Sequence, residues 1–93
     1  MRAKYIRGIE ALAGHWEAAS EIQMAIECYE KALEVDDLAE EFYQRLMICH
    51  HQLDRPAKVL AIYSRCCSVL EARFGIEPSV KTKALMATLC SGQ

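Results

Sequence analysis

Apolar residues recur along this chain at three- and four-residue steps, which is the spacing of one face of an α-helix. The clearest stripe lies between Ser20 and Val35, with charged residues between its apolar positions: Ile22, Ala25, Ile26, Tyr29, Ala32 and Leu33. A second stripe follows: Leu38, Phe42, Tyr43, Leu46, Cys49, His50 and Leu53. A third extends to about Phe74: Val59, Leu60, Tyr63, Cys66, Cys67 and Leu70. These patterns predict three amphipathic helices and an all-α fold.

Residues that start or stop helices stand between these stripes. Ser20 and Asp54 are expected to be N-caps, because their side-chain oxygens can accept hydrogen bonds from the first amides of a helix. Pro56 is tolerated in the first turn after Asp54, where the amide has no helical partner. Gly75 is expected to end the helix that closes near Phe74, because glycine readily takes a left-handed conformation.

Two further helices are predicted outside the three stripes. The first runs from Arg2 to about Ala19, although Gly8 and Gly14 each weaken it. The last is short and follows the turn Gly75–Pro78, with Ser79 as its cap and apolar residues on one side: Val80, Leu85 and Leu89. The expected total is five helices.

The chain aligns with itself when shifted by 34 residues, which is the period of tetratricopeptide helix–turn–helix repeats. The shift superimposes Ile9 on Tyr43, Leu12 on Leu46, Trp16 on His50, Ser20 on Asp54, Ala25 on Val59, Tyr29 on Tyr63 and Ala32 on Cys66. It predicts one tetratricopeptide-like domain with a right-handed helical repeat over residues 1–93. Repeat one is expected at about 5–37, repeat two at about 38–72, and a closing turn and helix at 75–91.

The composition agrees with a helical globule and excludes a disordered chain, with 53% hydrophobic and 26% charged residues. The net charge of −2 gives the chain no overall attraction to nucleic acid or anionic lipid. Residues 17–41, however, hold nine acidic side chains against Lys31, and residues 42–93 hold seven basic ones against three acidic. These segments could attract each other within the fold or between molecules, or they could simply be solvated helix faces.

The cysteines and the hydropathy indicate the cellular compartment in which the protein is expected. Five cysteines without a C-x-x-C spacing predict reduced thiols in a cytoplasmic protein. Nothing in the chain has the length of a membrane span, so no membrane contact is expected.

The second repeat and its tail carry a more specific pattern than a generic repeat. The segments concerned are 39–47, Leu53-Asp54-Arg55-Pro56-Ala57, 60–63 and 70–79 with its Gly-Ile-Glu-Pro-Ser turn, followed by Thr82 and Leu85. This pattern resembles the bacterial transcriptional activator domain of SARP-type and related regulators. The resemblance implies a helical module that contacts other domains of its regulator, a second copy of itself, or the transcription machinery. The glycine usual in the turn of each repeat is replaced near Ala19–Ser20 and Leu53–Asp54.

The candidate metal-binding and catalytic residues could instead have a purely structural role. Cys49, His50 and His51 with Cys66 and Cys67 offer zinc-ligand chemistry. However, neighbouring residues on a helix point about 100° apart, and several of these occupy expected core positions. No nucleophile sits in a strained turn, and no phosphate-binding glycine motif is present. We therefore expect no catalytic residue, no metal and no cofactor.

Direct contact with DNA is also not expected from this chain. Six basic residues could form a weak phosphate-facing surface: Arg55, Lys58, Arg65, Arg73, Lys81 and Lys83. No aromatic residues interleave them for base stacking.

The first helix of each repeat lines the concave side of a tetratricopeptide stack, and this geometry predicts an interaction face. Its expected members are Arg7, Glu10, Gly14, Glu17, Glu41, Gln44, Ile48 and His51. A chaperone-type carboxylate clamp would need Asn on this face, and the chain contains none.

Together these residues favour a non-enzymatic protein-interaction domain of a bacterial transcription regulator. The alternative is a free-standing adaptor or cochaperone that binds a peptide in its groove. Self-association, such as a homodimer, or docking onto a neighbouring domain is also expected, and either contact should weaken with salt.

Overall fold

The computed structural model describes the backbone of residues 2–91 and the side chains of residues 7–91. That part of the chain is helical, with short connections and no strand. The five helices are α1 (Arg2–Ala18), α2 (Ile22–Val35), α3 (Glu40–Gln52), α4 (Pro56–Phe74) and α5 (Val80–Ser91). The structure therefore confirms the predicted all-α fold with five helices.

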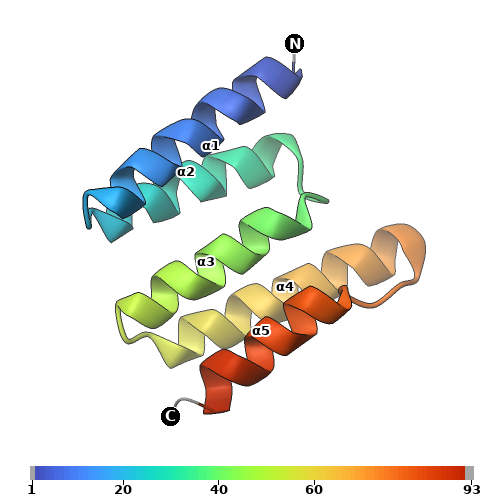
Figure 1. Cartoon of the computed structure of the whole chain (residues 1–93). Helices are drawn as coiled ribbons and strands as arrows, with labels where there is room; N and C mark the ends of the chain where they lie inside the picture. The colour runs from blue at the N-terminus through green and yellow to red at the C-terminus, as the bar shows by residue number, and fades with distance from the viewer. Residues whose placement is uncertain (1, 92–93) are drawn as a thin grey trace.

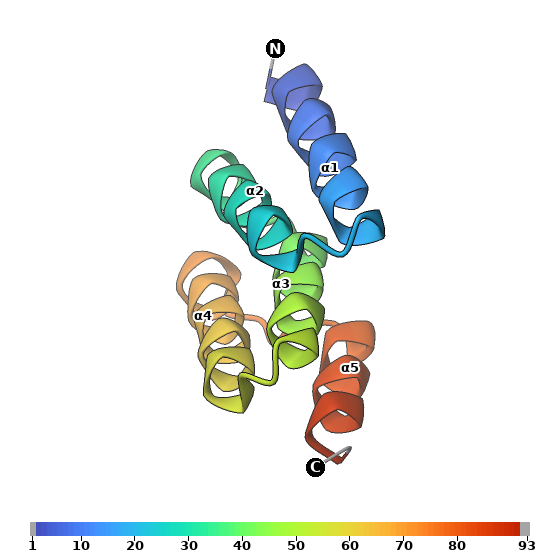
Figure 2. The same ribbon diagram turned by 90° about the vertical axis from the view of Figure 1, so that its left-hand side faces the viewer.

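The helices are arranged as a short stack of helical hairpins (Figure 1). α1 packs against α2 and α3 against α4, while α2 also packs against α3 to join the two hairpins. α5 lies against α3. In Figure 2, α2 and α4 occupy one side of the stack, and α1, α3 and α5 line the other. This second side is the concave side that the repeat predicted.

The small residues of the repeat lie in the core of the stack. Ala25, Ala32 and Cys66, which take the small positions of the repeat, are fully buried. The rings of Tyr29 and Phe42 pack beside them with centroids 5.9 Å apart. α3 is the most buried helix, because α2, α4 and α5 all pack against it.

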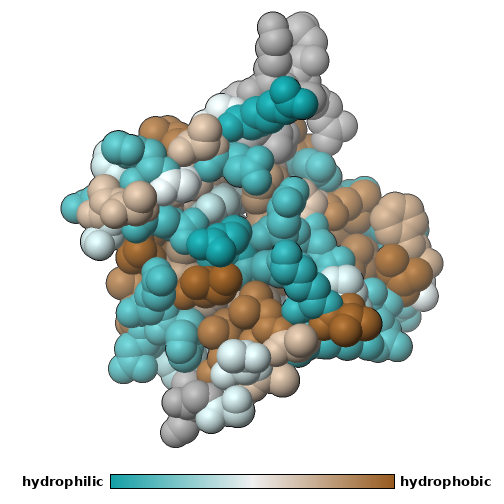
Figure 3. All heavy atoms as spheres, in the orientation of Figure 1, coloured by the Kyte–Doolittle hydropathy of each residue, from teal (hydrophilic) through white to brown (hydrophobic). Residues whose placement is uncertain are grey.

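Three expected core positions are instead exposed. Leu60 is 52% exposed and Val80 is 83% exposed, although both belong to predicted apolar stripes. Leu12 is 48% exposed, whereas its repeat equivalent Leu46 is completely buried. The difference between these two leucines follows from their helices, since α1 has α2 as its main neighbour and α3 has three. Phe74 is also exposed, and Figure 3 shows apolar atoms gathered at the α4–α5 turn that it precedes.

The predicted N-caps Ser20 and Asp54 are wrong. α2 begins after Glu21 and α4 after Arg55, and neither helix start has a side-chain cap. Ser20 and Asp54 instead have positive φ angles of 65° and 57° and end the preceding helices. The following amides close those ends, with Glu21 N–H donating to Trp16 O at 2.8 Å and Arg55 N–H donating to His50 O at 2.9 Å.

This is the Schellman arrangement, in which the left-handed residue is usually glycine. Ser20 and Asp54 therefore occupy the positions of the missing repeat glycines. Ser and Asp are favoured at caps and at turns, so their identity alone did not decide between the two.

The other predicted helix ends are confirmed. Pro56 is the first residue of α4. Gly75 has a φ of 63° and closes α4 by donating its N–H to Glu71 O at 2.9 Å. Ser79 Oγ accepts the Thr82 N–H at 3.4 Å and so caps α5.

Candidate functional site

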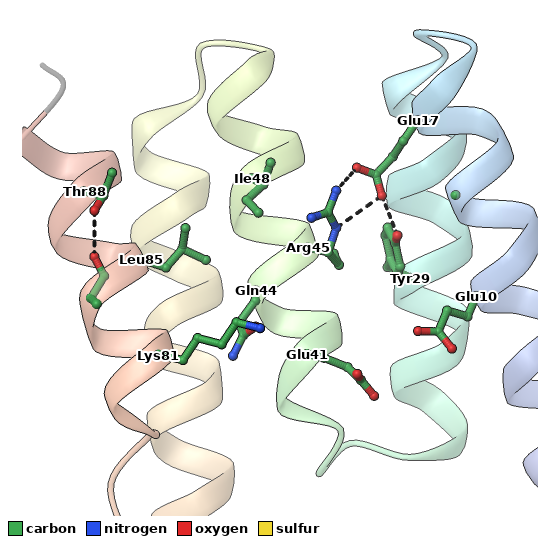
Figure 4. Close-up of a pocket in the computed structure, with 12 residues that line it drawn as sticks. Glu10, Glu17, Tyr29, Glu41, Gln44, Arg45, Ile48, Lys81, Leu85 and Thr88 are labelled. Atoms are coloured by element: carbon green, nitrogen blue, oxygen red, sulfur yellow. Dashed lines mark hydrogen bonds and ion pairs between the residues drawn. The ribbon is translucent and has the colours of Figure 1, made fainter.

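A groove of about 600 Å³ runs along the concave side of the stack. Residues of α1, α3 and α5 line it, together with one tyrosine of α2: Glu10, Gly14, Glu17, Tyr29, Glu41, Gln44, Arg45, Ile48, Lys81, Ala84, Leu85 and Thr88. Figure 4 shows these side chains converging on the space between α1, α3 and α5. Hydrophilic and hydrophobic patches lie side by side on the face that Figure 3 displays.

Most of the predicted concave residues meet in this groove. Glu10, Glu17, Glu41, Gln44 and Ile48 all line it, and Gly14 lies among them.

Two predicted residues lie elsewhere. Arg7 is exposed on α1, one turn before Glu10, and is not part of the lining. His51 lies in the last turn of α3, where it lines a separate hollow of about 250 Å³ with Pro56, Val59, Leu60, Leu89 and Cys90. The ends of α3 and α5 and the start of α4 meet there, so His51 faces this end of the stack.

Glu17 joins three helices at one wall of the groove. It forms an ion pair with Arg45 of α3 and accepts a hydrogen bond from the Tyr29 hydroxyl of α2 (Figure 4). Its side chain is only 14% exposed. Burial and the bond to Glu17 raise the pKa of Tyr29, and the same carboxylate raises the pKa of Arg45. Glu17 therefore links helices rather than presenting a free charge.

A second polar link holds α5 against α3. Glu40 Oε2 accepts hydrogen bonds from the Ser79 N–H at 2.8 Å, the Ser79 hydroxyl at 2.7 Å and the Thr82 hydroxyl. Gln44 Nε2 donates to Thr82 Oγ1 at 2.8 Å. Partial burial raises the pKa of Glu40, but the bonds from Thr82 and Ser79 outweigh it and hold that pKa below its ordinary value. Gln44 is only 9% exposed, and its amide nitrogen is occupied by this hydrogen bond within the fold.

Three charged residues remain available in the groove. Glu10, Glu41 and Lys81 are exposed, and none has a hydrogen bond or ion pair within the described residues. Figure 4 shows Glu10 and Glu41 pointing into the same opening between α1 and α3, while Lys81 reaches in from α5. Half-buried Ile48 and Leu85 supply apolar surface in the same groove.

The opposite charges of the two halves of the chain meet inside the fold. Three ion pairs join the acidic segment 17–41 to the basic segment 42–93: Glu17–Arg45, Glu30–Arg65 and Asp37–Arg73. The Glu30–Arg65 and Asp37–Arg73 contacts measure 2.8 Å and 3.0 Å. Of the alternatives that the charge pattern left open, attraction within the fold is therefore the one the structure displays.

Three members of the cysteine and histidine cluster are buried: Cys49, His50 and Cys66. Cys49 and Cys66 are fully buried, and burial raises the pKa of Cys49 to about 11 and that of Cys66 to about 12. All five cysteines are free thiols. Within residues 7–91, no three potential ligands from His, Cys, Asp and Glu come together around a possible ion position.

Six residues of the groove were not predicted from the sequence: Tyr29, Arg45, Lys81, Ala84, Leu85 and Thr88. Tyr29 was assigned to the core, and Lys81 to a possible basic surface. Their place in the groove depends on how α2 and α5 pack, and the repeat period does not specify this packing.

The comparisons with known proteins identify the class. The family model of the bacterial transcriptional activator domain matches residues 1–90. The chain belongs to this family, so the resemblance inferred from residues 39–85 is confirmed, and the domain is a regulatory one of the transcriptional activator type. Neither the curated proteins nor the solved structures contain a match. No helix in the described part of the chain is long and apolar enough to cross a bilayer.

Proposed function

We propose that this domain acts through protein–protein contact, with the concave groove as its contact surface. The observation that supports this is the set of groove charges left without partners around an apolar strip. Glu10 of α1, Glu41 of α3 and Lys81 of α5 line the same groove as the apolar side chains of Ile48 and Leu85. Exposed charges around apolar side chains are the usual composition of a protein-binding surface.

The groove also specifies the chemistry of its partner. A complementary segment places apolar side chains on Ile48 and Leu85, a basic residue near Glu10 and Glu41, and an acidic residue near Lys81. An amphipathic helix meets these demands, since it presents one apolar stripe with charges along its flanks. Candidate partners are another domain of the same regulator, a second copy of the chain, or a component of the transcription machinery.

The groove favours binding over catalysis. Its one tyrosine has a raised pKa and donates to Glu17, so it is a poor nucleophile. We therefore assign the domain a non-enzymatic role.

Two alternatives predicted from the sequence have less support than the regulatory role. A free-standing adaptor that binds a peptide would use the same groove, but membership in the transcriptional activator family favours the regulatory role. A salt-sensitive homodimer remains a proposal with less support, since much of the charge complementarity that suggested it is used in ion pairs within the fold.

Site-specific photo-crosslinking in the native host tests the proposal. A photoreactive amino acid at Ile48 should form covalent adducts, and mass spectrometry should identify the captured protein as a transcription regulator or a subunit of the transcription machinery. The same probe at Ser68, exposed on α4 and outside the groove, is the control. Equal capture at both positions, or partners unrelated to transcription at Ile48, would contradict the proposal.

A further inference from the structure

Residues of α2 and α4 make up most of the lining of a second hollow. These two helices occupy the side of the stack away from the groove (Figure 2). The volume of the hollow is about 370 Å³, within the range of small-molecule sites. Its polar lining comes from three helices and the α3–α4 turn: Gln23, Glu30, His50, Arg55, Lys58 and Arg65.

His50 is one of the residues that line this hollow. His50 is only 6% exposed, and its Nδ1 is buried without a hydrogen-bond partner. A buried polar atom without a partner costs free energy, and natural structures seldom contain one without a reason. Burial and the positive charges of Arg55 and Lys58 lower the pKa of His50, while Glu30 opposes them. The imidazole is therefore neutral near pH 7, and it lies in a positive field.

The cations around His50 outnumber the anions. Arg65 is paired with Glu30 at 2.8 Å, and Arg55 donates to the neutral amide oxygen of Gln23 at 3.2 Å. Lys58 is exposed and has no hydrogen bond or ion pair with the described residues. Arg55 and Lys58 also flank the start of α4, where the helix dipole adds further positive potential.

We propose that this hollow binds a small phosphorylated metabolite through its phosphate group. Lys58 and Arg55 contact the phosphate oxygens, and His50 becomes a third cation when the bound anion raises its affinity for a proton. The remaining lining, which includes Ile26, Ala61 and Ile62, accommodates the apolar part of the ligand. The site is separate from the concave groove, so a ligand here would give the regulator a small-molecule input that does not compete for the protein-contact surface.

The experiment follows His50 by NMR while inorganic phosphate is added to the whole chain at constant ionic strength. We expect a saturable shift of the His50 ring signal and a rise in its pKa. Sulfate has the same tetrahedral geometry and keeps its charge between about pH 5 and pH 8, so its affinity should rise as the pH falls through the pKa of His50. Lys58→Gln and Arg55→Gln should each weaken binding about tenfold, as expected for one charge-assisted hydrogen bond.

Matched controls separate a site from general charge effects. Lys31→Gln removes one exposed lysine of α2 that lines neither the hollow nor the groove, and it should leave anion binding unchanged. These substitutions lie on exposed positions, so the folded state is retained while the site is altered. Non-saturable shifts, an equal response to chloride, or equal weakening by Lys31→Gln would overturn the proposal. A short DNA duplex could also saturate the site with a much higher affinity than phosphate, and this affinity could be lost as salt is added. That result would assign the surface to binding of a DNA backbone and would also overturn the proposal.

Discussion

The Glu40→Gln substitution should loosen α5 from α3. Glu40 Oε2 alone accepts the Ser79 N–H, the Ser79 hydroxyl and the Thr82 hydroxyl, while α5 has its main contact with α3. Glutamine has the same shape and can still accept hydrogen bonds at this place, but it lacks the negative charge. The substitution therefore isolates the contribution of charge to the link between α3 and α5.

The size of the effect follows from the three bonds. Hydrogen bonds to a charged acceptor contribute about 1.5–3 kcal/mol each, against about 0.5–1.5 kcal/mol for neutral ones. Partial exposure and the cost of desolvating Glu40 reduce the difference, so we expect a loss of about 2 kcal/mol in the free energy of unfolding at about pH 7. This is a substantial fraction of the roughly 5–14 kcal/mol typical for a domain of this length.

Urea denaturation with a pH series measures this loss. The pKa of Glu40 in the folded domain lies below its ordinary value of 4.5, so its charge stabilises the fold above that value. The stabilisation is lost as the pH falls through the folded pKa, where the wild-type carboxyl becomes neutral. The difference between wild type and Glu40→Gln should therefore shrink toward zero in acid.

Glu41→Gln is the matched control for this measurement. Glu41 lies in the same first turn of α3, so the change removes the same charge from the same helix dipole, but Glu41 is exposed and has no described partner. Equal stability of the two variants at neutral pH would refute the reasoning. Faster amide exchange throughout α5 in Glu40→Gln alone would locate the loosening where the structure places it.

Three further substitutions or probes have defined outcomes. Ser20→Gly should raise the free energy of unfolding by about 0.5–1 kcal/mol, because serine is strained at a φ of 65°, and thermal melting would show it. Glu17→Gln should lower that free energy by about 1–3 kcal/mol, since Arg45 and Tyr29 lose a charged partner, whereas Glu10→Gln should change it by less than about 0.5 kcal/mol. In a thiol-reagent assay at neutral pH, exposed Cys90 should react at once, and Cys66 only upon unfolding, because Cys66 is fully buried and its pKa is raised to about 12. Rapid modification of every thiol in the native domain would count against the described core.

The helices could be predicted from the sequence because their signals are local. The apolar spacing between Ser20 and Val35 lies within a few turns, and Pro56 and Gly75 act on their own helix ends. The repeat period then placed α1 and α3 on a common face, which correctly brought together Glu10, Glu41 and Ile48.

The details of the groove could not be predicted in this way. Glu17 meets Arg45 across 28 residues and Tyr29 across 12. Such pairs depend on the angle between helices and on side-chain reach, which no local pattern records. Ser20 shows a different difficulty, since one residue type serves two roles and only the backbone conformation distinguishes them.

The central claim, that the domain regulates transcription through its groove, is tested most directly by RNA sequencing of the native host. Ile48→Glu places a charge on the apolar part of the groove, and should reproduce the expression changes of a gene deletion while the protein remains folded and abundant. Ser68→Glu, which adds the same charge outside the groove, should leave expression as in wild type. Wild-type expression with Ile48→Glu, or equal disruption by Ser68→Glu, would contradict the assignment of the groove as the regulatory contact.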